Sequence, residues 1–141
     1  MKKIFCLILL FGVLCSVSPD SFSEGVDAKS KIIAYYFHGS FRCATCTNME
    51  RYSKEAIETN FKDTLASGKL EFRPVNVEDK ENEHFVNDYQ LYTKALFLSF
   101  IEGGKEIKSK NLDKIWEYAR DKQKFVTYVS EEIHAFLGKT K

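Results

Sequence analysis

The sequence predicts a single α/β domain with the element order β-α-β-α-β-β-α, and three observations lead to this prediction. Apolar runs of strand composition lie at 31–37, 70–77 and 95–101. Between them, apolar residues recur at three- and four-residue steps, as on one face of a helix. Gly103-Gly104 follows the third run and is typical of a tight hairpin into a fourth strand. A strand-helix-strand start implies a parallel pair and the hairpin adds an antiparallel pair, so we expect a mixed central sheet flanked by helices.

The first half of the chain has clear element boundaries. The first strand is apolar at nearly every position, which predicts burial on both of its faces. A long helix is expected over 46–66, followed by Gly68 as a left-handed cap. Pro74 cannot donate a hydrogen bond to a ladder. We therefore expect the second strand, 70–77, at a sheet edge or at a bulge.

The second half is expected to begin with a shorter helix over 79–92. The fourth strand is short, at 105–108, and Asn111 caps the final helical region. That region bends around 121–124 and ends at Gly138.

Composition restricts the class of protein. The chain has 141 residues, of which 44% are hydrophobic and 29% charged, so one compact domain is the expectation. The formal net charge is +1, and no basic stripe carries interleaved aromatic residues. We therefore do not expect a nucleic-acid partner.

The N-terminus has the pattern of an export signal. Lys2 and Lys3 precede an unbroken apolar run, 4–15, which is too short to span a bilayer. Small residues near Ser23 favour cleavage after it. The expected organisation is a signal peptide over 1–23, a polar linker over 24–30 and the α/β domain over 31–138.

Two other interpretations of this N-terminus stay open. Cys15 is a candidate for a lipoprotein anchor, although bulky residues precede it. An uncleaved N-terminal anchor is the third possibility. In each case we expect export: a periplasmic or secreted protein, or one anchored in the membrane and facing the periplasm.

Two cysteines remain after export, Cys43 and Cys46, because Cys6 and Cys15 fall in or at the end of the signal. A pair spaced Cys-x-x-Cys closes too small a loop to stabilise a domain strongly. The pair follows a strand and a short turn and opens a helix. The first turn of a helix stabilises a thiolate through its free N–H groups and its dipole, and the thiolate is the nucleophile in disulfide exchange. We therefore expect redox chemistry, with Cys43 attacking and Cys46 resolving.

Two residues beside the pair are candidates for lowering the pKa of Cys43 and for contacting a partner. Arg42 places a positive charge next to Cys43 and should lower the pKa of its thiol. Phe41 is an aromatic residue on an expected exposed turn, so we expect it to contact a partner.

With Cys-x-x-Cys after the first strand, the element order resembles the thioredoxin-like fold over 31–137. More narrowly, two stretches resemble a family of small exported bacterial thioredoxin-like proteins, the ArsF-type family, named after a subunit of a system that reduces nitrophenyl compounds. The stretches are Tyr36-Phe37-His38-Gly39 with Arg42-Cys43-x-x-Cys46, and Asp88-Tyr89-Gln90-Leu91-Tyr92-Thr93-Lys94.

The sequence departs from thioredoxins in ways that bear on the site. Thioredoxins bury a carboxylate six residues before the first cysteine, where this chain has Phe37. They also present substrate with a cis-proline, and the corresponding position here is near Ala95 or Leu96. We expect a trans peptide bond at that position, because a cis bond without proline costs about 3 kcal/mol. Ala95 and Leu96 are the expected substrate-binding positions, and the missing proline favours a narrow client range.

The leading hypothesis is an exported thiol–disulfide oxidoreductase with a protein thiol or disulfide client, or a membrane electron donor, as partner. No cofactor is expected. An alternative is a copper or zinc carrier that uses Cys43 and Cys46, with His38 as a third ligand. A third is a non-catalytic interaction module with a closed disulfide. His38 has a simpler interpretation as a strand-end histidine that is bonded to backbone.

Overall fold

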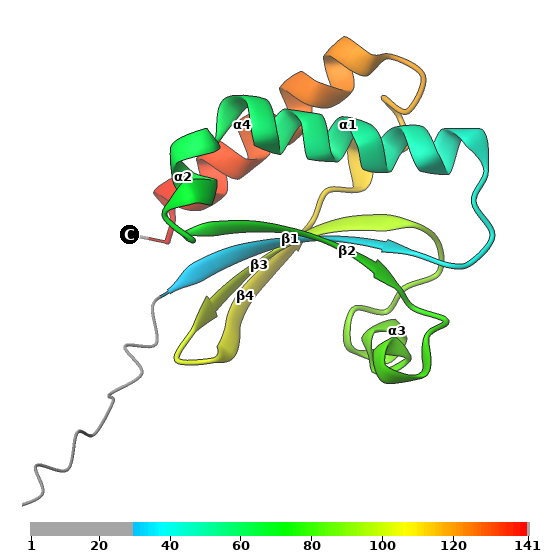
Figure 1. Cartoon of the computed structure of the whole chain (residues 1–141), viewed down its shortest axis with the longest axis horizontal. Coiled ribbons are helices and arrows are strands. Elements are labelled where there is room, and N and C mark those ends of the chain that lie inside the picture. Colours follow the sequence, from blue (N-terminus) through cyan, green and yellow to red (C-terminus); the bar gives the residue numbers. More distant parts are fainter. Residues whose placement is uncertain (1–29, 141) are drawn as a thin grey trace, which may run out of the picture.

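The computed structural model describes residues 30–140, and a four-stranded mixed sheet lies at its centre (Figure 1). The strand order is β2-β1-β3-β4, in which β1 is parallel to β2 and antiparallel to β3, and β3 is antiparallel to β4. The predicted mixed α/β architecture is therefore confirmed. The strands are β1 (Lys31–His38), β2 (Leu70–Asn76), β3 (Ala95–Glu102) and β4 (Lys105–Asn111).

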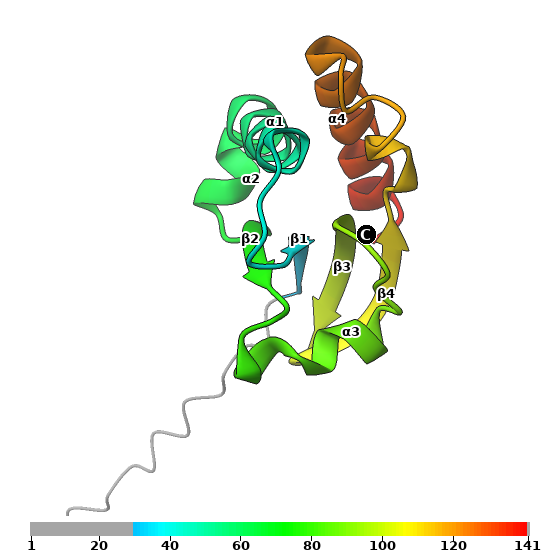
Figure 2. The same cartoon turned by 90° about the vertical axis from the view of Figure 1, so that its right-hand side faces the viewer.

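Helices cover both faces of the sheet. Figure 2 shows α1 and α4 together over one face and α3 over the other. The helices are α1 (Ala44–Asn60), α2 (Lys62–Ala66), α3 (His84–Asp88) and α4 (Lys122–Gly138), with the short 3₁₀ turns η1 (Lys80–Asn82) and η2 (Asp113–Ile115).

The central strand β1 divides the core into two clusters. Because successive side chains of a strand point to opposite faces, its even-numbered residues pack under α1 and α4 and its odd-numbered residues pack on the α3 side. The residues are Ile32, Ala34 and Tyr36 on the first face, and Ile33, Tyr35 and Phe37 on the second. All six are buried, which confirms burial on both faces of the first strand.

Two predictions, one about a proline in a strand and one about a glycine at a helix end, are confirmed. β2, which contains Pro74, is an edge strand, so the residue without an N–H lies where one ladder is absent. Gly68 has a φ of 71°, the left-handed conformation that a glycine cap adopts without strain.

The long helix expected over 46–66 is divided in two. α1 begins earlier, with Cys43 as its N-cap, and ends at Asn60. Phe61 adopts a φ of −130° between α1 and α2 and is almost fully buried. Its ring lies 4.6 Å from that of His134 on α4, measured between centroids. This contact between distant segments lies at the break, and local periodicity cannot reveal it.

The helix expected over 79–92 is also shorter than predicted. η1 and the five-residue α3 occupy its middle, and the chain then turns through Gln90, which has a φ of 50°. The N–H of Leu91 bonds the carbonyl of Val86 at 2.9 Å and closes the turn. The apolar residues of this segment pack on the second face of the sheet without a continuous helix.

The predicted Asn111 cap is wrong. Asn111 is the last residue of β4 and pairs with Phe97, so the strand extends three residues beyond the expected 105–108. Asp121 caps α4 instead, and its Oδ1 accepts a hydrogen bond of 3.1 Å from the N–H of Lys124. The expected strand was too short because β4 is polar and solvent-exposed along its length, so hydrophobicity does not mark its end.

The described elements run from Lys31 to Gly138. The predicted signal peptide, 1–23, and all but the last residue of the predicted linker lie outside the described residues. Across 30–140, no helix has both the length and the apolar character that a membrane crossing requires.

Candidate functional site: the dithiol at the start of α1

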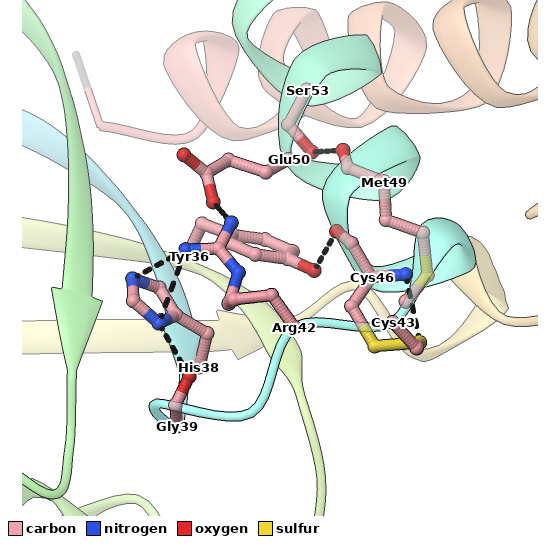
Figure 3. Close-up of polar contacts among 9 residues, drawn as sticks. All are labelled: Tyr36, His38, Gly39, Arg42, Cys43, Cys46, Met49, Glu50 and Ser53. Atoms are coloured by element: carbon pink, nitrogen blue, oxygen red, sulfur yellow. Dashed lines mark hydrogen bonds and ion pairs between the residues drawn. A yellow bond between two sulfur atoms is a disulfide. The ribbon is translucent and has the colours of Figure 1, made fainter.

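The two predicted redox cysteines form a disulfide at the N-terminus of α1 (Figure 3). Their Cα atoms are 5.1 Å apart. Cys43 is the N-cap, and its Sγ accepts a hydrogen bond of 3.2 Å from the N–H of Cys46. A sulfur at an N-cap lies against the free N–H groups and the positive end of the helix dipole. Both features stabilise a thiolate at Cys43 after reduction.

The cysteines differ in exposure. Cys43 is partly exposed, whereas Cys46 is only 2% exposed. A protein thiol or disulfide can reach the first sulfur and is excluded from the second. This difference suits the predicted roles, in which Cys43 attacks a partner and Cys46 resolves the mixed disulfide.

Tyr36 connects the sheet to this helix. Its hydroxyl donates a hydrogen bond of 2.7 Å to the backbone carbonyl of Cys46, and the side chain is fully buried. Tyr36 is not predicted as a site residue from the sequence, because aromatic residues in an apolar strand usually belong to the core. The signal that could have found it is alternation: Tyr36, not Phe37, shares a sheet face with α1.

Phe37 occupies the position at which thioredoxins have a buried carboxylate, and its side chain lies on the face of the sheet opposite to Tyr36. Its ring packs against Phe85 and Tyr89 from the α3 segment, with centroids 5.3 Å and 5.0 Å away. It is fully buried in the second core cluster. Phe37 therefore contributes to packing on the far side from α1.

Arg42 turns toward Glu50 and His38, as Figure 3 shows. Its Nη2 forms an ion pair with the Glu50 carboxylate on the second turn of α1. Its Nη1 lies 3.3 Å from Nε2 and 3.4 Å from Nδ1 of His38, so the guanidinium contacts both ring nitrogens. Glu50 compensates much of the Arg42 charge. The expected effect of Arg42 on the Cys43 pKa stays a prediction.

His38 ends β1 on the Tyr36 side of the sheet, with ring centroids 6.3 Å apart, as alternation predicts. Its Nδ1 is 3.0 Å from the Gly39 carbonyl, which matches the interpretation as a backbone-bonded histidine. Within residues 30–140, no three histidine, cysteine, aspartate or glutamate side chains are grouped to hold a metal ion.

The other predicted contact residues differ in accessibility. Phe41 is 76% exposed, as expected for a turn residue. Ala95 and Leu96 are buried at the start of β3, and the described part of the chain has no cis peptide bond, as predicted. In the preceding loop, the large hydrophobic side chain of Tyr92 is 95% exposed, and sequence reasoning did not select it. Trp116 holds this loop through a hydrogen bond of 3.0 Å from its Nε1 to the Lys94 carbonyl.

A hollow of about 180 Å³ lies between the end of β1 and the loop before β3, and His38, Gly39, Glu78 and Lys94 are among its lining residues. Glu78 accepts a hydrogen bond of 3.1 Å from the N–H of Ser40. This bonding to Ser40, aided by the charges of Lys94 and His38, holds the pKa of Glu78 below its usual range. The hollow brings two loops together beside the strand end that leads to the dithiol.

No family model and no curated protein matches the chain. Among solved structures, a thioredoxin from Fasciola hepatica is 24% identical, with a TM-score of 0.37, and the match covers 64% of this chain and 79% of the thioredoxin. A thioredoxin from Thermus thermophilus is 12% identical, also with a TM-score of 0.37, over 64% of this chain and 72% of that one.

The strand order, the directions of the strands and the Cys-x-x-Cys at the start of the first helix define a thioredoxin-like α/β fold. The two sulfurs are close enough to interconvert between a dithiol and a disulfide.

Proposed function

We propose that this protein is an exported thiol–disulfide oxidoreductase with a narrow client range. The observation that carries the proposal is the Cys43–Cys46 disulfide at the N-terminus of α1, with one sulfur accessible and the other buried. We also propose that it belongs with the small exported ArsF-type thioredoxin-like proteins, on the sequence stretches quoted above. The expected compartment is the periplasm or the exterior of the cell, as a soluble or a membrane-anchored protein.

The proposed reaction begins with the reduced pair. The Cys43 thiolate attacks a client disulfide, a Cys43–client bond forms, and one client sulfur leaves as a thiolate. Cys46 then loses its proton and attacks Cys43 Sγ. The Cys43–Cys46 bond forms, the Cys43–client bond breaks, and the second client sulfur leaves with the electron pair. The client is reduced by two electrons and the pair is oxidised by two.

In an oxidising compartment, a separate thiol donor must reduce the Cys43–Cys46 disulfide before the next cycle. We propose a protein dithiol or a membrane electron carrier as this partner. Exposed Phe41 and the loop that carries Tyr92 offer contact residues near the strand end of the site. The lack of a cis bond before β3 favours recognition of few clients.

The deciding test is the redox equilibrium of the metal-free protein against glutathione buffers, measured by alkylating the free thiols. A potential between about −120 and −270 mV, the range of known oxidoreductases, is the expected result and indicates the direction of exchange. A potential well below about −300 mV would mark a structural disulfide and leave a non-catalytic interaction module. If the pair oxidises only after metal is removed, the protein is a carrier.

The roles of the two cysteines can be tested by comparing how the two single serine variants capture clients. Cys46→Ser should accumulate mixed disulfides with clients in the cell, because the releasing sulfur is absent. Cys43→Ser should capture none, because its remaining thiol is buried. Non-reducing gels compare the two. Equal capture by both variants would contradict the assigned roles.

A further inference from the structure

The sheet reaches the dithiol helix through one buried polar contact. The Tyr36 hydroxyl donates to the Cys46 carbonyl at 2.7 Å, and the tyrosine is fully buried (Figure 3). The contact joins the central strand to the backbone of the resolving cysteine itself. Tyr36 is therefore placed to influence Cys46 without being reached by a client.

The phenol donates its proton to the Cys46 carbonyl in a hydrogen bond and does not act as a base. Burial raises the pKa of Tyr36 far above its ordinary value, and the nearby Glu50 carboxylate raises it further, against an opposing effect of Arg42. The hydroxyl therefore keeps its proton at every pH at which disulfide exchange is measured. Tyr36 cannot replace the absent carboxylate as the group that accepts the Cys46 proton.

Closure of the pair depends on how precisely Cys46 is held. Its sulfur must meet Cys43 Sγ in line with the bond that breaks, and a well-oriented intramolecular attack gains a large effective concentration. Cys43 is at the N-cap, where the preceding loop is irregular, whereas Cys46 is in the first turn and bonded to β1. The bond to β1 fixes the backbone from which the attacking sulfur extends.

We propose that Tyr36 is a positioning residue for the release step, acting through the Cys46 backbone to set the effective concentration of the resolving sulfur. The inference rests on the proposed function. In that step the Cys46 proton goes to water, the Cys43–Cys46 bond forms, and the client leaves as a thiolate. Tyr36 is neither oxidised nor deprotonated. Its hydrogen bond to the Cys46 carbonyl stabilises the backbone arrangement in which the Cys43–Cys46 disulfide forms.

Tyr36→Phe tests this directly, since it keeps the ring and removes the hydroxyl. The equilibrium constant for closing the disulfide against glutathione should fall about tenfold, the size of one buried hydrogen bond. For a two-electron couple, this raises the potential by about 30 mV. Release of a glutathione mixed disulfide at Cys43, followed by mass spectrometry after quenching, should slow by a similar factor.

Tyr35→Phe is the matched control, because Tyr35 neighbours Tyr36 but packs on the other face of the sheet. It should leave the potential unchanged. An unchanged potential in Tyr36→Phe, or an equal shift in both variants, overturns the proposal. If Tyr36→Phe does not fold, 3,5-difluorotyrosine encoded at position 36 replaces it. The fluorinated phenol is a stronger donor and must shift the potential in the opposite direction; no shift overturns the proposal.

This equilibrium is measurable whether or not the protein reduces any client. A wild-type potential below about −300 mV contradicts the proposed function, while the difference between Tyr36→Phe and Tyr35→Phe still tests the hydrogen bond. Failure of one proposal is therefore distinguishable from failure of the other.

Discussion

The positive charge that precedes Cys43 in the chain is largely compensated by an acidic partner. Arg42 directly precedes Cys43, but the guanidinium pairs with Glu50, and the two side chains are 31% and 25% exposed. A pair this accessible stabilises the fold only slightly, by about 0.5 kcal/mol. Its larger effect is electrostatic, because Glu50 reduces the positive potential that Arg42 creates at the start of α1.

Glu50→Gln should therefore make Cys43 more reactive. Removal of the carboxylate leaves the Arg42 charge uncompensated, which lowers the pKa of the Cys43 thiol. Alkylation of the reduced protein by iodoacetamide at pH 6 should accelerate about two- to threefold, while the alkylation rate at high pH stays the same.

Glu58→Gln is the control, because Glu58 pairs with Lys54 farther along α1. It removes the same charge at a greater distance from the cysteines, so the rate at pH 6 should stay close to that of the wild type. A Glu50→Gln rate equal to that of Glu58→Gln contradicts the proposed influence of Arg42.

The connection from β1 to α1 determines where the dithiol lies. β1 ends at His38, and the backbone then passes beneath the Glu78 side chain, which bonds the N–H of Ser40. A Cβ on Gly39 would overlap Glu78 Oε1 and lie 3.1 Å from its Cδ. A side chain at position 39 would therefore force the carboxylate end of Glu78 to move.

Gly39→Ala should displace the Glu78 carboxylate and break its bond to Ser40. We expect a lower free energy of unfolding, because the backbone N–H of Ser40 loses its carboxylate acceptor. Urea denaturation measures the loss. Gly138→Ala is the control, because a Cβ there meets nothing within 4 Å. Adding Glu78→Ala to Gly39→Ala should cause little further loss, and a fully additive loss would show that the two residues do not interact.

Among residues 30–140, folding lowers the pKa of three carboxyl groups, which therefore stabilise the folded state when ionised. The backbone N–H of Lys124 lowers the pKa of Asp121, and bonding to Ser40 lowers that of Glu78. Burial alone would raise the pKa of Glu71, but hydrogen bonds from Lys31 and Arg73 outweigh it and lower the pKa. Each folded pKa is below its unfolded value. The stabilisation is therefore complete above about pH 4.5 and is lost as the pH falls through the depressed folded pKa values.

The free energy of unfolding should accordingly decrease from pH 5 to pH 3, because the unfolded chain binds more protons than the folded one over this window. Urea denaturation at pH 7, 5, 4 and 3 measures the decrease. Glu71→Gln and Asp121→Asn should each flatten the profile below pH 5. Profiles parallel to that of the wild type would exclude these two carboxylates as its source.

The sequence was sufficient to predict a structural feature where a local pattern of residues corresponds to one physical requirement. A continuous apolar run predicted a strand buried on both faces, Pro74 predicted an edge strand, and Gly103-Gly104 predicted the hairpin. The spacing of Cys43 and Cys46 likewise predicted a pair at a helix start. These features depend on a few neighbouring residues, so the amino-acid order alone determines them.

Other features depend on contacts between distant segments, and only the tertiary structure decided them. The break at Phe61 coincides with a contact to α4, and β4 is longer than expected because pairing with β3 outweighs its polar composition. The fold alone brings Tyr36 to Cys46 and Arg42 to Glu50. A sequence shows which side chains can donate or carry charge, whereas their partners are set by how strand alternation and helix packing orient them in three dimensions.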